Sequence, residues 1–544
     1  MDFNLAQVHE AIAAAIPDRE CIVFRDRRLT WREVTERSRQ LAHWLRSRGM
    51  GARSDRSGLA GHESHQDHLA LYLHNGNEYI EGMLGAYKAR VAPFNVNYRY
   101  VAEELRYLLT DAGARGVVYH AAFAPTLAEV LPDLPGVTVL LQVADESGNE
   151  LLPGAVEYEA ALASMPVDRP PWADDWSPDD LYILYTGGTT GMPKGVLWRQ
   201  GDIFVSALGG SEQETIDPIV KAAKGGGMRF LPSPPFMHGA GHWIAFVGFH
   251  GGHTIVIQDE VTRLDPADIL RTIERERVSF LLIVGDAFAR PILNEMDKGG
   301  YDLSTLKVVL SGGAPLNSTL KTRFLEHLPE LLLIDGLGSS EAGGQMQQVS
   351  TAGTEATTGT FLPSPGTCIV DEAMTTVLPP GHEGFGWLAK SGRVPLGYHG
   401  DEDKTARTFP VIDGVRYAVP GDRARQRADG IVELLGRDSV CINSGGEKIF
   451  AEEVEAGLGH HPDVYDVVVC GRPSEQWGQE VVAIVQLRPG VVGGAAAEAA
   501  LLDECAKHIA RYKLPKAFMF VDEVVRSPSG KADYRWAKQL AAPA

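Results

Sequence analysis

The chain has 544 residues, of which 44% are hydrophobic and 22% charged, a balance typical of soluble globular proteins with two or more domains. This length and composition disfavour extended disorder and a small disulfide scaffold. The 51 Lys and Arg against 71 Asp and Glu give a formal net charge of −20, so general attraction to nucleic acid is not expected. An anionic ligand therefore needs a local site.

The cysteines and the first residues bear on the compartment. Five cysteines are scattered without a close pair of the kind that marks zinc ligation or a redox dithiol, which predicts reduced thiols in a cytoplasmic protein. Met1–Asn4 carries neither a basic region nor an apolar run, so no signal peptide is predicted. No stretch reaches the roughly 20 apolar residues that span a bilayer. Peripheral membrane contact and a homodimer are left open.

Apolar, β-branched runs alternate with helical stretches through much of the chain. The runs are Leu181–Tyr185, His253–Ile257, Phe280–Val284, Val308–Leu310 and Leu331–Ile334. Asp265 can cap a helix that has Pro266 at its first position and continues to Glu276. The alternation predicts an α/β architecture. Earlier in the chain, His62, His65 and His68 recur in the polar stretch 54–67, which we interpret as a solvated loop.

The pattern of residue types and predicted elements changes twice toward the C-terminus. From about Asp371, Gly and Pro punctuate short strands, including Gly381–Gly386 and Val415–Gly421, which predicts a β-rich subdomain. Residues 440–544 are interpreted as a small α+β domain with these elements: a helix over Ala451–Leu458, a strand over Val464–Cys470, a surface loop at Ala495–Ala500 entering a helix, and a helix around Asp503–Tyr512. We place the domains at 1–436 and 440–544, with a hinge at 437–439.

The strongest motif follows the apolar run that ends at Tyr185. Glycines let backbone N–H groups converge on an anion, threonine hydroxyls add donors and a lysine adds positive charge, so the segment predicts a polyphosphate-binding loop. Its residues are Thr186, Gly187, Gly188, Thr189, Thr190, Gly191 and Lys194. Met192 and Pro193 separate the last glycine from the lysine, and no Ser or Thr follows, so the loop does not match the Walker pattern.

The loop resembles the signature of adenylate-forming enzymes, the superfamily of acyl-CoA synthetases, peptide-synthetase adenylation domains and firefly luciferases. Further motifs of the family occur in order. The resemblance implies a nucleotide site formed by Gly312, Gly313, Ala314, Asp335, Gly336, Leu337, Gly338, Ser339 and Ser340. It also implies that Glu341 holds Mg²⁺, which suits a carboxylate beside triphosphate. Leu337 stands where many relatives have Tyr.

The same resemblance assigns roles to later segments. Asp422 and Arg437 match the ribose-binding pair, and Ser444, Gly445 and Gly446 match the loop that faces the pantetheine tunnel of CoA. At the hinge, Ser439 replaces the usual Asp or Lys. Lys531 matches the adenylation lysine, whose ammonium stabilises charge on the α-phosphate.

The acyl side of the site is expected near His238, which matches the family's histidine. With Lys531, Glu341 and Thr186 it completes the predicted catalytic set. No Asp or Glu lies between Phe236 and His250, which argues against an amino-acid substrate because its ammonium needs a partner. We expect open volume at Gly239, Gly241, Gly248, Gly251 and Gly252, and Gly338 stands where acetate-activating relatives carry Trp. A carboxylic acid with a large apolar body is therefore predicted.

The C-terminal motifs are most similar to actinobacterial FadD-type acyl-CoA synthetases, which act on fatty acids or steroid side chains. The family implies a large α/β domain and a small mobile C-terminal domain that rotates between half-reactions. It also implies a ligase that uses ATP and Mg²⁺ to form acyl-AMP and pyrophosphate, and then CoA to form a thioester. Alternatives are an acyl-AMP ligase serving a carrier protein, a CoA ligase for aryl or other acids, an amino-acid adenylating enzyme, and a non-catalytic binding protein.

Overall fold

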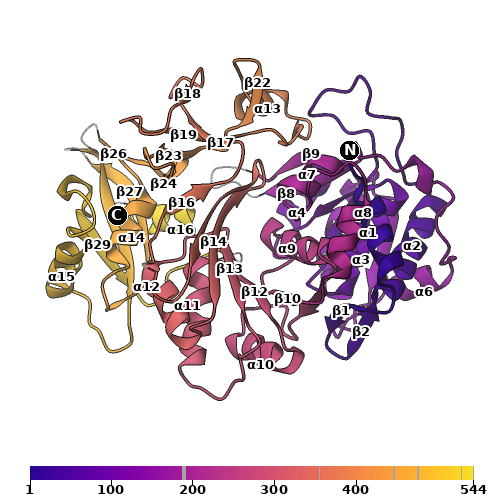
Figure 1. Cartoon of the computed structure of the whole chain (residues 1–544), viewed down its shortest axis with the longest axis horizontal. Helices are drawn as coiled ribbons and strands as arrows, with labels where there is room; N and C mark the ends of the chain where they lie inside the picture. The colour runs from indigo at the N-terminus through magenta and orange to yellow at the C-terminus, as the bar shows by residue number, and fades with distance from the viewer. Residues whose placement is uncertain (187–191, 355, 445–446, 475–476, 528–529, 543–544) are drawn as a thin grey trace.

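The computed structural model describes the chain from residue 1 to residue 544 except 187–191, 355, 445–446, 475–476, 528–529 and 543–544. In Figure 1 the start of the chain forms the lobe at the right, and its C-terminal part forms the lobe at the left. Parallel sheets with helices fill the right lobe and the centre. The predicted α/β class, with a large N-terminal domain and a small C-terminal domain, is confirmed.

The right lobe contains a parallel sheet in which β3 lies between β4 and β5. Its strands are β4 (Ala92–Asn95), β3 (His68–Tyr72), β5 (Ala114–His120), β6 (Val139–Val143) and β7 (Val156–Glu157). The helices around it are α1 (Leu5–Ala15), α2 (Trp31–Ser47), α3 (Asn77–Ala89), α4 (Ala102–Asp111), α5 (Ala124–Val130) and α6 (Tyr158–Ala163). Side chains alternate along β3: Leu69 and Leu71 join one apolar cluster, whereas Ala70 and Tyr72 join another. Both faces of this sheet are therefore buried.

A second, larger sheet begins with parallel strands. These are β1 (Glu20–Phe24), β11 (Thr254–Ile257), β10 (Arg229–Pro232), β12 (Phe280–Ile283), β13 (Val308–Gly312) and β14 (Leu332–Ser339), and β2 (Arg27–Thr30) pairs antiparallel at the edge. The helices in this part are α7 (Gln200–Ser206), α8 (Asp217–Lys224), α9 (Gly239–His250), α10 (Pro266–Glu276), α11 (Gly285–Met296) and α12 (Ser318–His327). The predicted helix is confirmed as α10, because Asp265 caps it and Pro266 is its first residue.

The same sheet continues as antiparallel strands beyond β14. They are β15 (Gly343–Ser350), β16 (Thr360–Pro363), β24 (Val432–Arg437), β23 (Asp422–Gln426), β19 (Gly386–Ser391), β17 (Thr367–Val370), β18 (Val377–Leu378), β22 (Val415–Ala418) and β21 (Val411–Ile412). A separate sheet joins β20 (Gly397–Tyr398), β9 (Lys194–Arg199) and β8 (Leu181–Thr186), next to α13 (Glu402–Thr408). The predicted β-rich character of the segment that begins at about Asp371 is confirmed. The predicted strand at Gly381–Gly386 is wrong, because Gly381 adopts a φ of +83° in a turn and β19 starts only at Gly386.

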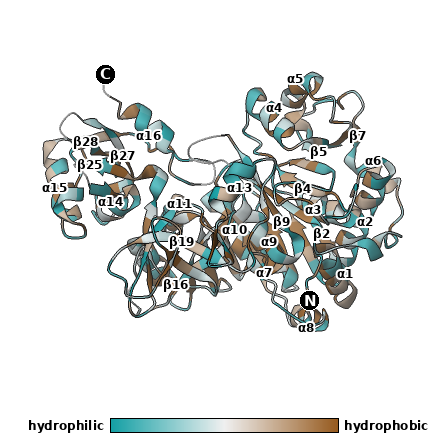
Figure 2. Cartoon of the chain, turned by 90° about the horizontal axis from the view of Figure 1, so that it is seen from above, coloured by the Kyte–Doolittle hydropathy of each residue, from teal (hydrophilic) through white to brown (hydrophobic). Residues whose placement is uncertain are grey.

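The small domain has its own sheet, at the left of Figures 1 and 2. It contains β26 (Glu447–Ile449), β25 (Ile442–Ser444), β28 (Gly478–Leu487), β27 (Val464–Ser474) and β29 (Ala517–Val521), with α14 (Ala451–Leu458), α15 (Ala495–Cys505) and α16 (Tyr534–Leu540). The predicted helix α14 is confirmed. The predicted helix over 503–512 and the predicted surface loop at Ala495–Ala500 are both wrong: α15 begins at Ala495, the first residue of the alanine run, and ends at Cys505. The run is helical because Ala has the highest helix propensity.

The interpretation of 54–67 as a solvated loop is confirmed for 54–64, where no residue is buried, and is wrong for the end of the stretch. His65 and His68 are only 2% and 3% exposed. His68 begins β3, and its ring bonds the carbonyl of Ala112 and the hydroxyl of Ser64. Among the helices of the described ranges, none has both the length and the apolar character needed to cross a membrane.

Candidate active site

Several of the predicted nucleotide-site segments lie at one edge of the large sheet. The parallel strands β12, β13 and β14 point the same way, so their carboxyl ends share an edge. β13 ends at Gly312, and β14 ends at Ser339 just before Glu341. Ligands of α/β sheets bind at this edge. The fold therefore places the predicted nucleotide segments together.

Asp422 and Arg437 face each other across β23 and β24, where they are register partners. Arg437 Nε lies 3.3 Å from Asp422 Oδ1. Burial raises the pKa of Asp422 above its ordinary value, and the charge of Arg437 counteracts part of that rise. The arrangement offers an acceptor and a donor side by side, as a ribose diol requires.

Glu341 is held by a residue that the sequence analysis did not single out. Tyr398 Oη, on β20, donates to Glu341 Oε1 over 2.8 Å. Burial, followed by the charge of Glu341, raises the pKa of Tyr398, so the phenol is a neutral donor. This bond uses one carboxylate oxygen and orients the other. The described residues hold no cluster of three or more His, Cys, Asp or Glu for a metal, and one carboxylate suits Mg²⁺, which keeps water and phosphate ligands.

Lys531 of the small domain lies at the same edge, where the charges of Arg437, Glu341 and Asp422 act on it. Gly530, with a φ of +77°, lies so close to α11 that an added Cβ would stand 3.2 Å from the Ala287 side chain. Lys531 Cε would be 4.0 Å from a Cβ added at Gly313. Solvent reaches the lysine, yet surrounding protein and then Arg437 lower its pKa, while Glu341 opposes the shift.

His238 occupies the N-cap position of α9 without a side-chain capping hydrogen bond, and the charge of Lys531 acts on it. Its Nε2 is buried with no hydrogen-bond partner among the described residues. Burial, and next the charge of Lys531, lowers the pKa of His238 to about 3. A neutral imidazole with an unpaired nitrogen is suited to orienting a polar ligand, not to carrying charge.

Lys194 has a partner that the motif did not reveal. Its Nζ lies 2.9 Å from Asp111 Oδ1, and the hydroxyl of Tyr185 donates to the other oxygen of Asp111 over 2.9 Å. Thr186 ends β8 and is the register partner of Lys194. The remaining loop predictions, Gly187, Gly188, Thr189, Thr190 and Gly191, lie outside the described residues.

The other predicted positions divide between the edge and the interior. Asp335 is 3% exposed, and its Oδ2 lies 2.8 Å from Lys321 Nζ, so this carboxylate is engaged in a buried ion pair. Ser339 Oγ is buried without a partner among the described residues. Leu337 packs against an apolar cluster. The remaining strand and turn residues at this edge are Gly312, Gly313, Ala314, Gly336, Gly338 and Ser340.

Ser444 lies in the small-domain sheet, where it pairs with Glu447 and Gly478. These strand contacts do not bring it to Lys531. Gly445 and Gly446 lie outside the described residues.

The expectation of open volume at the glycines around α9 is wrong. An added Cβ would approach Pro235 O to 2.6 Å at Gly241, Ile255 Cδ1 to 2.5 Å at Gly248 and Ala223 O to 2.1 Å at Gly252. Similar short approaches occur at Gly239 (3.0 Å) and Gly251 (2.7 Å). These glycines permit close packing, so they do not indicate an acyl cavity.

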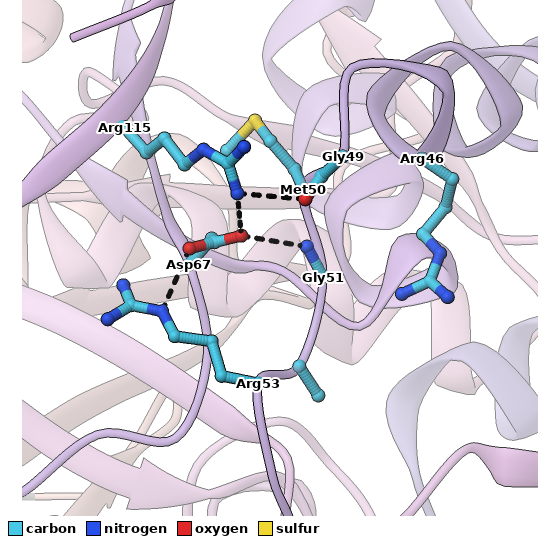
Figure 3. A pocket seen from close by; sticks show the side chains of 8 residues that line it. Arg46, Gly49, Met50, Gly51, Arg53, Asp67 and Arg115 are labelled. Atoms are coloured by element: carbon cyan, nitrogen blue, oxygen red, sulfur yellow. Dashed lines mark hydrogen bonds and ion pairs between the residues drawn. The ribbon is translucent and has the colours of Figure 1, made fainter. Parts of the chain in front are cut away.

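A cavity of about 350 Å³ lies in the right lobe, beside the starts of β3 and β5. Figure 3 shows Asp67 at its centre, bonded to Arg53, Arg115 and the Gly51 amide. Because the Asp67 carboxylate already pairs with two guanidinium groups, we interpret this cluster as a structural one that holds the loop at Gly51 in place.

The chain matches the model of the AMP-binding enzymes over residues 9–399 and that of the AMP-binding enzyme C-terminal domain over residues 453–531. It belongs to the AMP-binding enzyme family. It is 57% identical to the medium-chain acyl-CoA ligase Mig of Mycobacterium avium, covering 99% of this chain and 98% of that protein. It is 40% identical to a medium/long-chain-fatty-acid/3-oxocholest-4-en-26-oate CoA ligase of Mycobacterium marinum, covering 98% and 96%.

Solved structures of AMP-binding enzymes share the fold. The anthranilate CoA ligase AuaEII with anthranoyl-AMP superposes with a TM-score of 0.83 at 22% identity, covering 99% of this chain and 98% of that one. A fatty acyl CoA synthetase of Mycobacterium tuberculosis gives a TM-score of 0.69 at 21% identity, covering 99% of each chain.

Proposed function

We propose that this AMP-binding enzyme is an acyl-CoA synthetase that activates a medium- or long-chain carboxylic acid. One observation carries the proposal: Lys531 of the small domain lies close enough to Asp422, Arg437 and Glu341 for their charges to act on it, and Arg437 and Asp422 form an ion pair. The 57% identity to a medium-chain acyl-CoA ligase supports the reaction and a fatty acid as substrate.

In the first step, a carboxylate oxygen of the acid attacks the α-phosphorus of ATP. The bond from that phosphorus to the bridging oxygen breaks, and pyrophosphate leaves. Asp422 and Arg437 hold the ribose, and the Lys531 ammonium stabilises the charge that builds on the α-phosphate. Glu341 would hold Mg²⁺, which neutralises phosphate charge when bound. His238 orients the carboxylate.

In the second step, the thiolate of CoA attacks the acyl carbon, and the bond from that carbon to the AMP oxygen breaks. AMP is a good leaving group, whereas a free carboxylate is a poor electrophile. Ser444 with Gly445 and Gly446 would face the pantetheine. Because Lys531 lies beside Arg437, Glu341 and Asp422 in this structure, the small domain must turn to present that loop. We assign the domains to 1–436 and 440–544, with the hinge at 437–439.

The proposed chemical class of the acid rests on the substrates for which similar proteins are named. Several are named for both fatty acids and 3-oxocholest-4-en-26-oate, so a steroid side-chain acid is the second candidate. An acyl-AMP ligase is a weaker alternative: a fatty acid–[acyl-carrier-protein] ligase of Streptomyces coeruleorubidus is 30% identical. Since ATP and CoA are intracellular metabolites, we place the reaction in the cytoplasm.

The test is release of AMP and pyrophosphate by the purified protein with Mg·ATP, with and without CoA. The panel contains acetate, octanoate, palmitate, a steroid side-chain acid, benzoate and phenylalanine. We expect CoA-dependent AMP release with octanoate or a larger acid. Pyrophosphate release without CoA consumption would indicate an acyl-AMP ligase, and activity only with phenylalanine, or none at all, would contradict the proposal.

A further inference from the structure

The hinge strand is contacted by an acidic side chain of the small domain. Glu452 is the second residue of α14, and its Oε1 accepts from the Arg437 amide over 3.4 Å. At Gly436, which adopts a φ of +125°, an added Cβ would lie 2.4 Å from Glu452 Oε2. Only glycine accommodates both the conformation and this approach. Glu452 therefore docks α14 directly on the end of β24.

The surroundings of this carboxyl are poorly suited to a negative charge. Its Oε2 is buried and has no hydrogen-bond partner among the described residues. The charged and titratable groups that face it are the guanidinium of Arg437 on β24, Asp422 on β23, Glu455 on α14, Tyr534 on α16 and Cys441 beside the hinge. One cation is thus shared by several acids.

We propose that Glu452 is a positioning residue that docks the small domain on the hinge strand, and so favours the orientation that delivers Lys531. Arg437, whose backbone it contacts, is the proposed ribose ligand. The inference rests on the proposed function for its enzymatic readout. It assigns to Glu452 no contact with ATP, the acid or CoA.

The sign of the pH effect follows from the burial. Burial raises the pKa of docked Glu452 to about 7, whereas a solvated glutamate has a pKa of about 4.3. The docked orientation therefore binds the extra proton. The stabilisation that this proton gives the docked orientation is fully present below the pKa of a solvated glutamate. It is lost as the pH rises from that value to about 7, and it changes no further at higher pH. Docking is therefore weaker at pH 7 and above than under acidic conditions.

The experiment compares wild type with Glu452→Gln, which has the shape of the neutral acid and cannot ionise. Glu453→Gln is the matched control, because Glu453 is the next residue of α14 and pairs with Lys513 within the small domain at 2.6 Å. Octanoate-dependent ATP–pyrophosphate exchange reports adenylation from pH 5.5 to 8.5. Thioester formation from supplied octanoyl-AMP and CoA reports the other orientation.

We expect the exchange rate of Glu452→Gln relative to wild type to rise by roughly threefold or more between pH 5.5 and 7.5, and then to level. Groups that both enzymes share cancel in this ratio. The ratio for the thioester step should not rise. A flat exchange ratio, or the same rise with Glu453→Gln, would overturn the proposal.

A readout without catalysis separates this inference from the proposed function. Amide hydrogen exchange of the peptide that contains Arg437 should be slower in Glu452→Gln than in wild type at pH 8, and equal at pH 5.5. If no acid supports pyrophosphate exchange, the proposed function fails while this comparison still decides on Glu452. Equal exchange at both pH values would contradict the docking role.

Discussion

Arg423 Nε donates to Asp438 Oδ1 over 2.9 Å and thereby ties the hinge to the large domain. Arg423 is 1% exposed, and its guanidinium lies 3.3 Å from the centroid of the Trp387 ring. On its other side it bonds the carboxylate of Glu372. Lys448 of the small domain lies 3.8 Å from Glu372 and 3.7 Å from Asp438. A chain of charges therefore connects the two domains at the hinge.

The first prediction concerns this charge chain. Glu372→Gln removes the carboxylate between Arg423 and Lys448 and should weaken the present domain orientation. The pair with Lys448 is exposed, so we expect about 1 kcal/mol or less, which is at most a roughly fivefold loss of pyrophosphate exchange. The thioester step from supplied acyl-AMP should be unaffected or faster.

The control for this variant is Glu330→Gln, which removes a surface ion pair with Lys307. Salt provides a second check: 0.5 M NaCl screens exposed charges and should reduce the difference between Glu372→Gln and wild type. Equal loss of both half-reactions would indicate general damage instead of a change in orientation.

The second prediction separates the half-reactions at Lys531. Lys531→Ala removes the ammonium from the α-phosphate site and should slow adenylation by roughly 100-fold or more. Thioester formation from supplied octanoyl-AMP should stay within a few-fold of wild type. Lys538→Ala, at an exposed position of α16, serves as the control for small-domain folding. If adenylation and thioester formation fell together, the division of labour would be refuted.

The third prediction tests the ribose pair. Asp422→Asn weakens the acceptor for the ribose hydroxyls and leaves Arg437 without its ion-pair partner. Hydrogen bonds that involve a charged group contribute about 1.5–3 kcal/mol, so the KM for ATP should rise roughly tenfold or more. Wild type should also discriminate against 2′-deoxy-ATP more strongly than the variant does. Identical discrimination would remove Asp422 from the ribose site.

Local patterns made much of the fold predictable. The helix over Pro266–Glu276 follows from a capping Asp and a first-turn Pro, which act within a few residues. The helix of the alanine run was missed, although its composition favours it, because low complexity was interpreted as a loop. The prediction of open volume at the glycines around α9 failed for another reason. A sequence does not show whether a missing Cβ leaves empty space or lets a neighbouring group pack closely.

Site residues that belong to family motifs could be predicted from the sequence. Residues that contact them from far away in the sequence could not. Asp422 and Arg437 were named from the sequence and do lie on paired strands. Asp111 and Tyr398 were not, since they meet Lys194 and Glu341 from 83 and 57 residues away. Tertiary structure alone brings these partners together, and neither belongs to a recognisable spacing.

The fourth prediction follows from one of these missed partners. Tyr398→Phe removes the hydroxyl that orients Glu341 and should weaken Mg²⁺ binding in the presence of ATP. Groups that orient a metal ligand typically contribute a factor of about 10–100 in affinity, so we expect the Mg²⁺ concentration for half-maximal adenylation to rise roughly tenfold. Glu341→Gln should raise it further. Tyr301→Phe is the matched control, because Tyr301 donates to Glu295 in an ordinary tyrosine–glutamate pair of 2.7 Å. An unchanged Mg²⁺ dependence in Tyr398→Phe would show that Glu341 needs no such support, and an unchanged dependence in Glu341→Gln would place the metal elsewhere.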